Sequence, residues 1–307
     1  MITAHILTKN NIKTIQKTLE SISGISTKIL IGDYGSNDGT IEICKKFNTK
    51  IIDVQKLPRN IARKKLSDSS ESEINFWIEP WETFLKNESA IKNFKNDTGY
   101  IRILQNNFIY WDVRIWRNNC DFLNPIFEKI DDSKSSDTSC IFLSQGSSYC
   151  NDDYNQIQKW KKENPLSKEP LYYESFLLLS QGKYDEFLKS ADLYLFYEKK
   201  ESISSIMTRY HYAYVQLIHK KQFKPVLQNL NLCLCSKPLM AEFWCLKGDV
   251  YYHLLKKYTF AKEFYENAKI LGSKRLSSDK CPMDISKYEK YPSKMIESCN
   301  AILNMKI

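Results

Sequence analysis

Short apolar runs alternate with helical patterns over the first half of the chain, and this alternation restricts the possible folds more than any other feature. Residues 2–7 have the pattern of a buried strand, and apolar side chains recur at helical spacing over residues 12–22. Strands predicted at residues 28–33 and 50–54 flank a second helix at residues 41–47. Strands that alternate with helices form a mostly parallel sheet covered on both faces. We therefore expect an α/β domain with a Rossmann-like order of elements.

The alternation continues with less regular spacing up to about residue 150. We expect about six strands in all, the later ones antiparallel, and a polar surface loop at residues 131–139. The last predicted strand closes a first domain that we place at residues 1–150. The further elements are a helix at 59–66 and strands at 74–78, 100–104, 110–116 and 140–143.

From about Tyr154 the strand pattern disappears, and an internal repeat of helical segments takes its place. The segments GKYDEFLKSADLY, KQFKPVLQNLNLC and KYTFAKEFYENA align with Phe187, Val226 and Ala261 at equivalent positions. These residues lie 39 and 35 positions apart, which brackets the period of about 34 of tetratricopeptide repeats. We predict an all-α tetratricopeptide-like (TPR-like) domain at residues 151–307. A generic helical bundle with an aromatic core stays open as the alternative.

The composition excludes several classes of protein. No apolar run approaches the ~18 residues that span a bilayer, and the first residues lack a signal-peptide pattern, so we expect a cytoplasmic protein without a transmembrane segment. The nine cysteines have no metal-binding spacing and are expected to be reduced. A net charge of +9 favours phosphate ligands, nucleic acid or an acidic membrane surface. Because the lysines are spread along the whole chain, a nucleic-acid patch is the less favoured explanation.

Residues 32–40, GDYGSNDGT, lie where a predicted strand ends and a helix begins. Ligands of open α/β sheets bind at that edge. Asp33 at the strand tip can accept hydrogen bonds from a base or a ribose, while glycine allows a tight turn. The alternative is an ordinary turn in which Ser36 or Asn37 caps the following helix.

Three motifs follow one another at a suitable spacing: Thr8-Lys9-Asn10-Asn11, then Asp33-Tyr34-Gly35-Ser36-Asn37-Asp38-Gly39-Thr40, then Arg59-Asn60-Ile61-Ala62. In this order they resemble the family 2 glycosyltransferases, and the resemblance covers roughly residues 1–146. The branch of the family that the chain looks most like carries a tetratricopeptide tail. The resemblance implies a nucleotide-sugar-binding domain of the GT-A fold.

By this resemblance, Asp33 contacts the nucleotide base, Arg59 binds the base or a phosphate, and Thr8 and Asn10 line the nucleotide cleft. A guanidinium offers planar donors to a carbonyl or phosphate oxygen, and a carboxylate accepts from base or sugar donors. The donor implied is a nucleotide sugar of the UDP type. For Arg59 the alternative is a solvated position at the start of a helix.

The chain departs from the family at the D-x-D element, where carboxylates hold a divalent metal. The aligned segment is Ile78-Glu79-Pro80-Trp81-Glu82-Thr83, so Glu79 replaces the first carboxylate, Trp81 stands at the second, and Glu82 follows one position later. A longer side chain shifted by one position does not reproduce the metal geometry. Glu79 and Glu82 are therefore the candidate ligands of Mn²⁺ or Mg²⁺, in an arrangement that departs from the family's.

Two further segments have lost a histidine. Residues 122–128 resemble the family's G-x-I-H-E segment with Phe127 in place of histidine, and residues 142–146 lack a histidine before the glycine. Glu128 remains as a candidate general base that deprotonates an acceptor hydroxyl, thiol or amide. The alternative for Glu128 is a surface carboxylate beside Lys129.

Together these features predict an enzyme, a glycosyltransferase of the hexosyltransferase type. It would move a sugar from a nucleotide-diphosphate donor to a protein, peptide or glycan acceptor with inversion. The repeats would present the acceptor, bind a protein partner or mediate self-association, because stacked helix pairs form concave surfaces. Two alternatives stay open: a non-catalytic adaptor that acts through its helical repeats, and a protein that binds nucleic acid through its basic surface.

Overall fold

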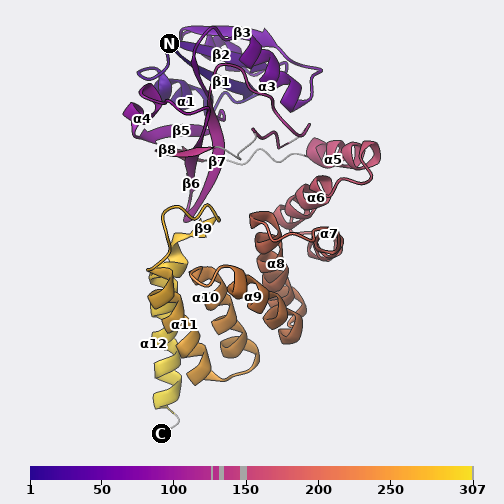
Figure 1. Ribbon diagram of the computed structural model, residues 1–307, viewed down its shortest axis with the longest axis vertical. Helices are drawn as coiled ribbons and strands as arrows, with labels where there is room; N and C mark the ends of the chain where they lie inside the picture. The colour runs from indigo at the N-terminus through magenta and orange to yellow at the C-terminus, as the bar shows by residue number, and fades with distance from the viewer. Residues whose placement is uncertain (126, 131–134, 146–150, 306–307) are drawn as a thin grey trace. The chain divides into compact units, whose positions relative to one another are not determined.

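The structure is a computed structural model that describes residues 1–125, 127–130, 135–145 and 151–305. The chain divides into two compact units, Met1–Gln156 and Ile157–Ile307 (Figure 1). The boundary lies inside helix α5 (Asn151–Glu163), and the sequence predicts it at residue 150, just before this helix. Unit 1 mixes strands and helices, and unit 2 is mainly helical.

The sheet of unit 1 joins a parallel part to a mixed part. The strands follow the order β3-β2-β1-β4-β7-β6-β8-β5. The pairs β1–β2, β2–β3, β1–β4 and β6–β8 are parallel, whereas β7 is antiparallel to β4 and β6, and β5 is antiparallel to β8. The strands are β1 (Ile2–Thr8), β2 (Lys28–Asp33), β3 (Thr49–Asp53), β4 (Ile74–Trp77), β5 (Glu82–Lys86), β6 (Thr98–Gln105), β7 (Phe108–Arg117) and β8 (Ser136–Ser144).

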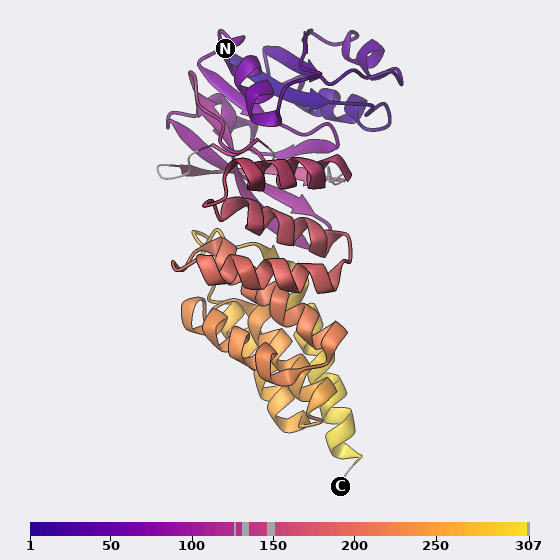
Figure 2. The same cartoon turned by 90° about the vertical axis from the view of Figure 1, so that its right-hand side faces the viewer.

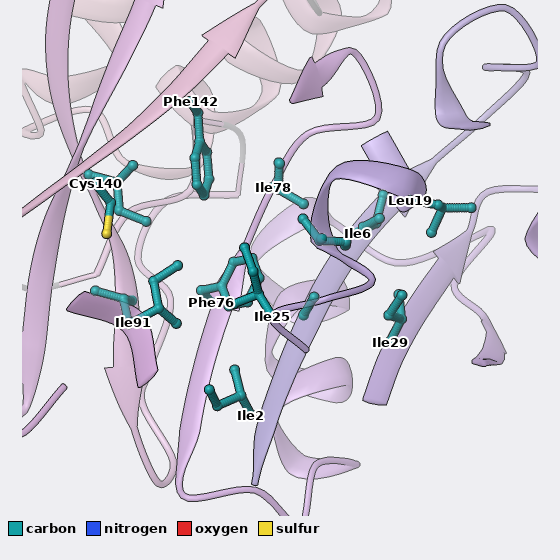
Figure 3. Close-up of a cluster of buried hydrophobic side chains, with 14 of the residues drawn as sticks. Ile2, Ile6, Leu19, Ile25, Ile29, Phe76, Ile78, Ile91, Cys140 and Phe142 are labelled. Carbon is teal, nitrogen blue, oxygen red and sulfur yellow. The ribbon is translucent and has the colours of Figure 1, made fainter. Parts of the chain in front are cut away.

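Different helices cover the two faces of this sheet. Ala4 and Ile6 of β1 belong to a large apolar cluster with residues of α1 (Ile15–Ile22), α2 (Thr40–Cys44) and α4 (Glu88–Lys92), part of which Figure 3 shows. Leu7 of β1 belongs to a second cluster with Ala62 and Leu66 of α3 (Arg59–Asp68). Successive side chains of a strand point to opposite faces, so one strand contributes to both clusters.

Several elements differ from the sequence prediction. Residues 136–139, expected in a loop, belong to β8, while residues 131–134 and Gly146 lie outside the described residues. Helix α2 ends at Cys44, three residues earlier than expected, and neither β5 nor α4 was predicted. The partners of β8 and β5 are strands distant in sequence, so local composition does not reveal these pairings.

Unit 2 is a succession of helices, each packed chiefly on its neighbours in sequence (Figure 2). Such nearest-neighbour packing is typical of a helical repeat stack. No helix among the described residues is long and apolar enough to cross a membrane. The elements are α6 (Glu169–Ser180), α7 (Tyr184–Tyr197), α8 (Ile203–Val215), the π-helix η1 (Gln216–Lys220), α9 (Phe223–Ser236), α10 (Ala241–Asp249), the π-helix η2 (Val250–Leu254), α11 (Tyr258–Gly272), β9 (Met283–Asp284), the 3₁₀ helix η3 (Ile285–Tyr288) and α12 (Lys290–Asn304).

The helix pairs repeat in backbone detail as well as in sequence. The three aligned residues of the sequence repeat are buried on α7, α9 and α11, the second helices of the pairs. Five positions before each of them stands a residue with positive φ: 69° at Gly182, 52° at Lys221 and 55° at Lys256. The same left-handed turn therefore joins the two helices in all three repeats.

The turn at Gly182 gives a test of this backbone requirement. A Cβ there would meet no atom within 4 Å, so Gly182→Ala introduces only conformational strain. We expect it to lower the free energy of unfolding by about 1 kcal/mol, measured by urea denaturation. Gly24→Ala is the matched control, because its Cβ also meets nothing within 4 Å and its φ lies outside the left-handed region. Equal losses in the two variants would contradict the assignment.

Glu242 on α10 is a buried acid held by the segment that follows α11. Its carboxylate accepts hydrogen bonds from the backbone N–H of Asp284 (2.8 Å) and the hydroxyl of Tyr288 (3.0 Å). A guanidinium nitrogen of Arg275 lies 3.9 Å away. Burial outweighs these contacts and raises the pKa of Glu242 to about 7.

This raised pKa predicts a pH dependence of stability. The folded state binds the proton more tightly than the unfolded state, so the contribution is fully present below the unfolded pKa of 4.5 and is lost as the pH rises to about 7. Between pH about 5 and about 8, the free energy of unfolding of the unchanged protein should fall by roughly 3 kcal/mol because of Glu242, and this fall should be absent in Glu242→Gln. Urea unfolding of both proteins at the two pH values measures it. Parallel pH profiles would show that Glu242 is not the titrating group.

Candidate functional site

The carboxyl ends of the parallel strands form one edge of the unit 1 sheet. Thr8, Asp33 and Asp53 are register partners at the ends of β1, β2 and β3. On the other side of β1, β4 ends at Trp77, two residues before Glu79. Four chain segments therefore bring polar side chains to one edge, where ligands of open α/β sheets bind.

Around Asp33, two loops are joined by hydrogen bonds. Oδ1 of Asp33 accepts from the backbone N–H (3.0 Å) and the hydroxyl (2.7 Å) of Ser36. From the loop after β1, the backbone N–H of Asn10 donates to Oγ of Ser36 (3.0 Å), and Oδ1 of Asn10 accepts from the backbone N–H of Asn37 (2.9 Å). Asn10 and Asp33, both predicted to bind the nucleotide, are thus held together, partly by their own side chains.

Thr8 and the start of α2 complete these loops. Thr8 is buried, and its hydroxyl donates to Oδ1 of Asn11 (2.9 Å). Helix α2 begins after Gly39, whose φ is 95°, and the backbone N–H of its first residue, Thr40, donates to Oδ1 of Asp38 (3.0 Å). The alternative role of Ser36 or Asn37 as helix cap is therefore wrong, because the helix starts later and Ser36 bonds Asp33.

Arg59, Arg63, Glu79 and Glu128 form a group of ion pairs that we call the Arg–Glu cluster. Nε and Nη2 of Arg59 donate to Oε2 (2.9 Å) and Oε1 (3.0 Å) of Glu128, and Nη2 lies 3.3 Å from Oε1 of Glu79. Arg63 donates from Nε to Oε1 of Glu128 (2.9 Å) and from Nη2 to Oε1 of Glu79 (2.5 Å). Each carboxylate is therefore shared by both guanidiniums.

Arg63 is the member of this cluster that sequence reasoning missed. It lies four residues after Arg59 on α3, and residues at this spacing project from the same face of a helix. The side chain of Arg59 is 26% exposed, whereas that of Arg63 has no exposed surface. The Arg63 guanidinium lies 5.0 Å from the ring centroid of Trp77, and its Nη1 has no hydrogen-bond partner among the described residues.

A second group of charges adjoins the Arg–Glu cluster. Glu82 accepts a hydrogen bond from the backbone N–H of Glu79 (2.9 Å) and pairs with Arg114. Nε of Arg114 also donates to Asp112 (2.8 Å), and its guanidinium lies 5.7 Å from the ring centroid of Trp77. Glu79 and Glu82, predicted to hold a metal, are thus neighbours, but each is paired with arginine.

Burial and charge act in opposite directions on these acids. Burial alone would raise the pKa of Glu128, but Arg59 and Arg63 outweigh it and hold that pKa well below its usual range. For Glu82, burial outweighs Arg114 and raises the pKa. At neutral pH Glu128 is therefore an anion bound by two cations, and a poor proton acceptor in this arrangement.

These carboxylates do not fit a tightly bound divalent metal. The carboxylates of Glu79, Glu82 and Glu128 are already engaged by arginines, so a metal would have to displace guanidinium groups. In the part of the chain that the structure describes, no group of three or more His, Cys, Asp or Glu side chains is arranged to hold a metal. Positive charge at this edge comes from arginine instead.

No family model and no curated protein matches the chain. Among solved structures, residues 1–349 of S. aureus TarS in complex with UDP-GlcNAc match 98% of this chain and 91% of that one, at 12% identity and a TM-score of 0.38. MamA from Desulfovibrio magneticus RS-1, residues 41 to the end, matches 50% of this chain and 81% of that one, at 19% identity and a TM-score of 0.39. A tetratricopeptide repeat protein from Parabacteroides merdae matches 49% and 54%, at 18% identity and a TM-score of 0.38. At these TM-scores, function has to be inferred from the side chains of the chain itself.

The Arg–Glu cluster predicts a large effect of removing its buried cation. Arg63→Met leaves Glu79 and Glu128 with only Arg59, and we expect a loss of about 3 kcal/mol or more in the free energy of unfolding. The double variant Arg63→Met/Glu79→Gln should recover part of this loss, because one buried charge is removed. Lys28→Met, which breaks the exposed pair with Glu71, is the control and should cost less than about 1 kcal/mol. Urea denaturation of the four proteins measures these differences, and a loss at Arg63 no larger than at Lys28 would contradict the cluster.

Proposed function

We propose that unit 1 is a GT-A-type domain that binds a nucleotide-diphosphate sugar, of the UDP type, at the carboxyl edge of its parallel strands. One observation carries the proposal: the Asp33 loop and Arg59 belong to the same edge. Tyr34, next to Asp33, donates its backbone N–H to the carbonyl oxygen of Thr8 (3.0 Å). Its side chain lies within electrostatic reach of both Arg59 and Glu128. A base near Asp33 and a diphosphate near Arg59 would fit this arrangement.

Arginine would do at this edge what a metal does in metal-dependent transferases. Arg59 is partly exposed and can turn from Glu128 towards a phosphate, while the buried Arg63 stays between Glu79 and Glu128. The two carboxylates thus keep a compensating charge when Arg59 leaves. A guanidinium binds a phosphate with two parallel hydrogen bonds and stabilises the charge of a departing diphosphate.

Transfer of the sugar would follow from the same exchange of partners. Once Arg59 faces the diphosphate, Glu128 keeps only Arg63, and its pKa rises towards the usual range. Glu128 can then take the proton of an acceptor hydroxyl as the acceptor oxygen bonds to the anomeric carbon. The bond from that carbon to the diphosphate breaks in the same step, which inverts the configuration. The tetratricopeptide-type repeats of unit 2 would present a protein, peptide or glycan acceptor.

A non-catalytic adaptor is the second candidate, and the ion pairs themselves favour it. Glu79, Glu82 and Glu128 are all bound by arginines, so the fold keeps these carboxylates even where no chemistry needs them. In this case unit 1 would act as a structural domain, and the repeats would carry the interaction with a partner.

Titration with UDP and hydrolysis of a panel of nucleotide sugars that includes UDP-GlcNAc separate the two candidates. We expect UDP to bind equally well with EDTA and with manganese. Arg59→Gln should weaken binding about tenfold or more, because a hydrogen-bonded charge pair with phosphate is lost. Asp33→Ala should also weaken it.

Lys64→Gln is the matched control, since Lys64 lies on the same helix and pairs with Asp68 at the surface. Its affinity for UDP should equal that of the unchanged protein. Binding without turnover across the panel would favour the adaptor over the transferase. Absence of both binding and turnover would reject the nucleotide site.

A further inference from the structure

The net positive charge of the chain belongs entirely to unit 2. Residues 157–307 contain 25 Lys and Arg against 16 Asp and Glu, whereas residues 1–156 contain 20 of each. Unit 1, which carries the proposed nucleotide site, therefore has no net charge, and the excess of nine positive charges lies in the repeats of unit 2.

Part of this charge lies in the turns between the two helices of a repeat. Lys221 lies at the turn from η1 to α9 and Lys224 in the first turn of α9, while Lys256 and Lys257 lie at the turn from η2 to α11. All four side chains are exposed. Among the described residues none of them has a carboxylate within ion-pair distance, so their charges are not neutralised locally. We call these four residues the turn lysines.

The stacking of repeats brings the two turns to the same edge of unit 2. Lys221 and Lys256 are equivalent residues 35 positions apart, each in the left-handed conformation and each preceded by a π-helix. Equivalent turns of stacked helix pairs recur along one side of the stack. Lys220, at the same turn, is bound by Asp185 (2.6 Å) and contributes less free charge.

Exposed apolar side chains stand beside the turn lysines. Ile218 of η1 is 42% exposed, Phe223 at the start of α9 is 39% exposed, and Phe260 in the first turn of α11 is 49% exposed. A single exposed apolar residue needs no explanation, but here three of them adjoin unpaired cations at equivalent turns. Lysine combined with aliphatic and aromatic tips is the composition of surfaces that bind the interface of an anionic bilayer. Phe223 and Phe260 can stack on bases, but Ile218 has no ring, whereas all three side chains can enter the apolar part of a bilayer interface.

We propose that this edge docks unit 2 on an anionic lipid surface. The turn lysines lie against the headgroups, and Ile218, Phe223 and Phe260 enter the interfacial layer. This inference concerns a surface of unit 2 and does not depend on the nucleotide site of unit 1.

Vesicle sedimentation of the full chain tests the proposal. We expect binding to phosphatidylcholine vesicles that contain roughly one third phosphatidylglycerol, and little binding to phosphatidylcholine alone. Replacing the four turn lysines by glutamine should lower the partition coefficient at least about tenfold, since each lysine near an anionic surface contributes to binding. Phe260→Ser should lower it by a smaller factor of about three and leave the salt dependence unchanged.

A matched variant removes the same charge elsewhere. Lys162, Lys189, Lys274 and Lys294 are likewise exposed on unit 2 outside these turns, and their fourfold change to glutamine should leave most of the binding intact. An equal loss of vesicle binding in both fourfold variants would show that binding depends only on net charge, and would overturn the proposal. Absence of binding to the anionic vesicles, or displacement from them by single-stranded RNA at low concentration, would overturn it as well. Circular dichroism verifies that each variant is folded.

Discussion

The pairing of the buried Arg63 guanidinium with two carboxylates is the interaction on which the carboxyl edge of the unit 1 sheet depends. It lies between Glu79, Glu128 and the ring of Trp77, without exposed surface of its own. Two nearly buried carboxylates would be strongly destabilising without such a cation. Arg63 therefore ties α3 to the end of β4 and to the loop that carries Glu128. Because it remains with both acids, Arg59 can change its partner without leaving a buried charge uncompensated.

A fixed guanidinium differs from a bound metal in what it permits. It cannot be exchanged or removed by a chelator, and it binds phosphate by directed hydrogen bonds. Its positive charge is present whether or not a donor is bound, so its ion pairs with Glu79 and Glu128 need no ligand. The ion pairs by themselves are therefore compatible with both candidates, a transferase that uses arginine in place of a metal and a domain that has kept only the fold. The distinction lies in whether Arg59 leaves Glu128 when a diphosphate arrives.

Unit 2 follows a different principle, since its architecture is repeated rather than assembled from distant segments. In each of these pairs, a residue in the left-handed conformation follows the first helix, and these residues are Gly182, Lys221 and Lys256. Lysines that are widely separated in the sequence are thereby brought to one edge, beside exposed apolar side chains. Lysines that are spread along the sequence therefore lie on one edge of unit 2, and this is the physical basis of the proposed lipid-docking edge.

Sequence patterns alone determined the features that depend on neighbouring residues. These are the alternation of strands and helices, the repeat that aligns Phe187, Val226 and Ala261, and the turn after Asp33, because periodicity and turn chemistry are local. Only the tertiary structure decided the pairing of β5 and β8 and the pairing of Arg63 with Glu128, which is 65 residues away. It also decided that Glu79, Glu82 and Glu128 face arginines rather than open space. Contacts between distant segments depend on which strands pair in the sheet, and no local pattern records them.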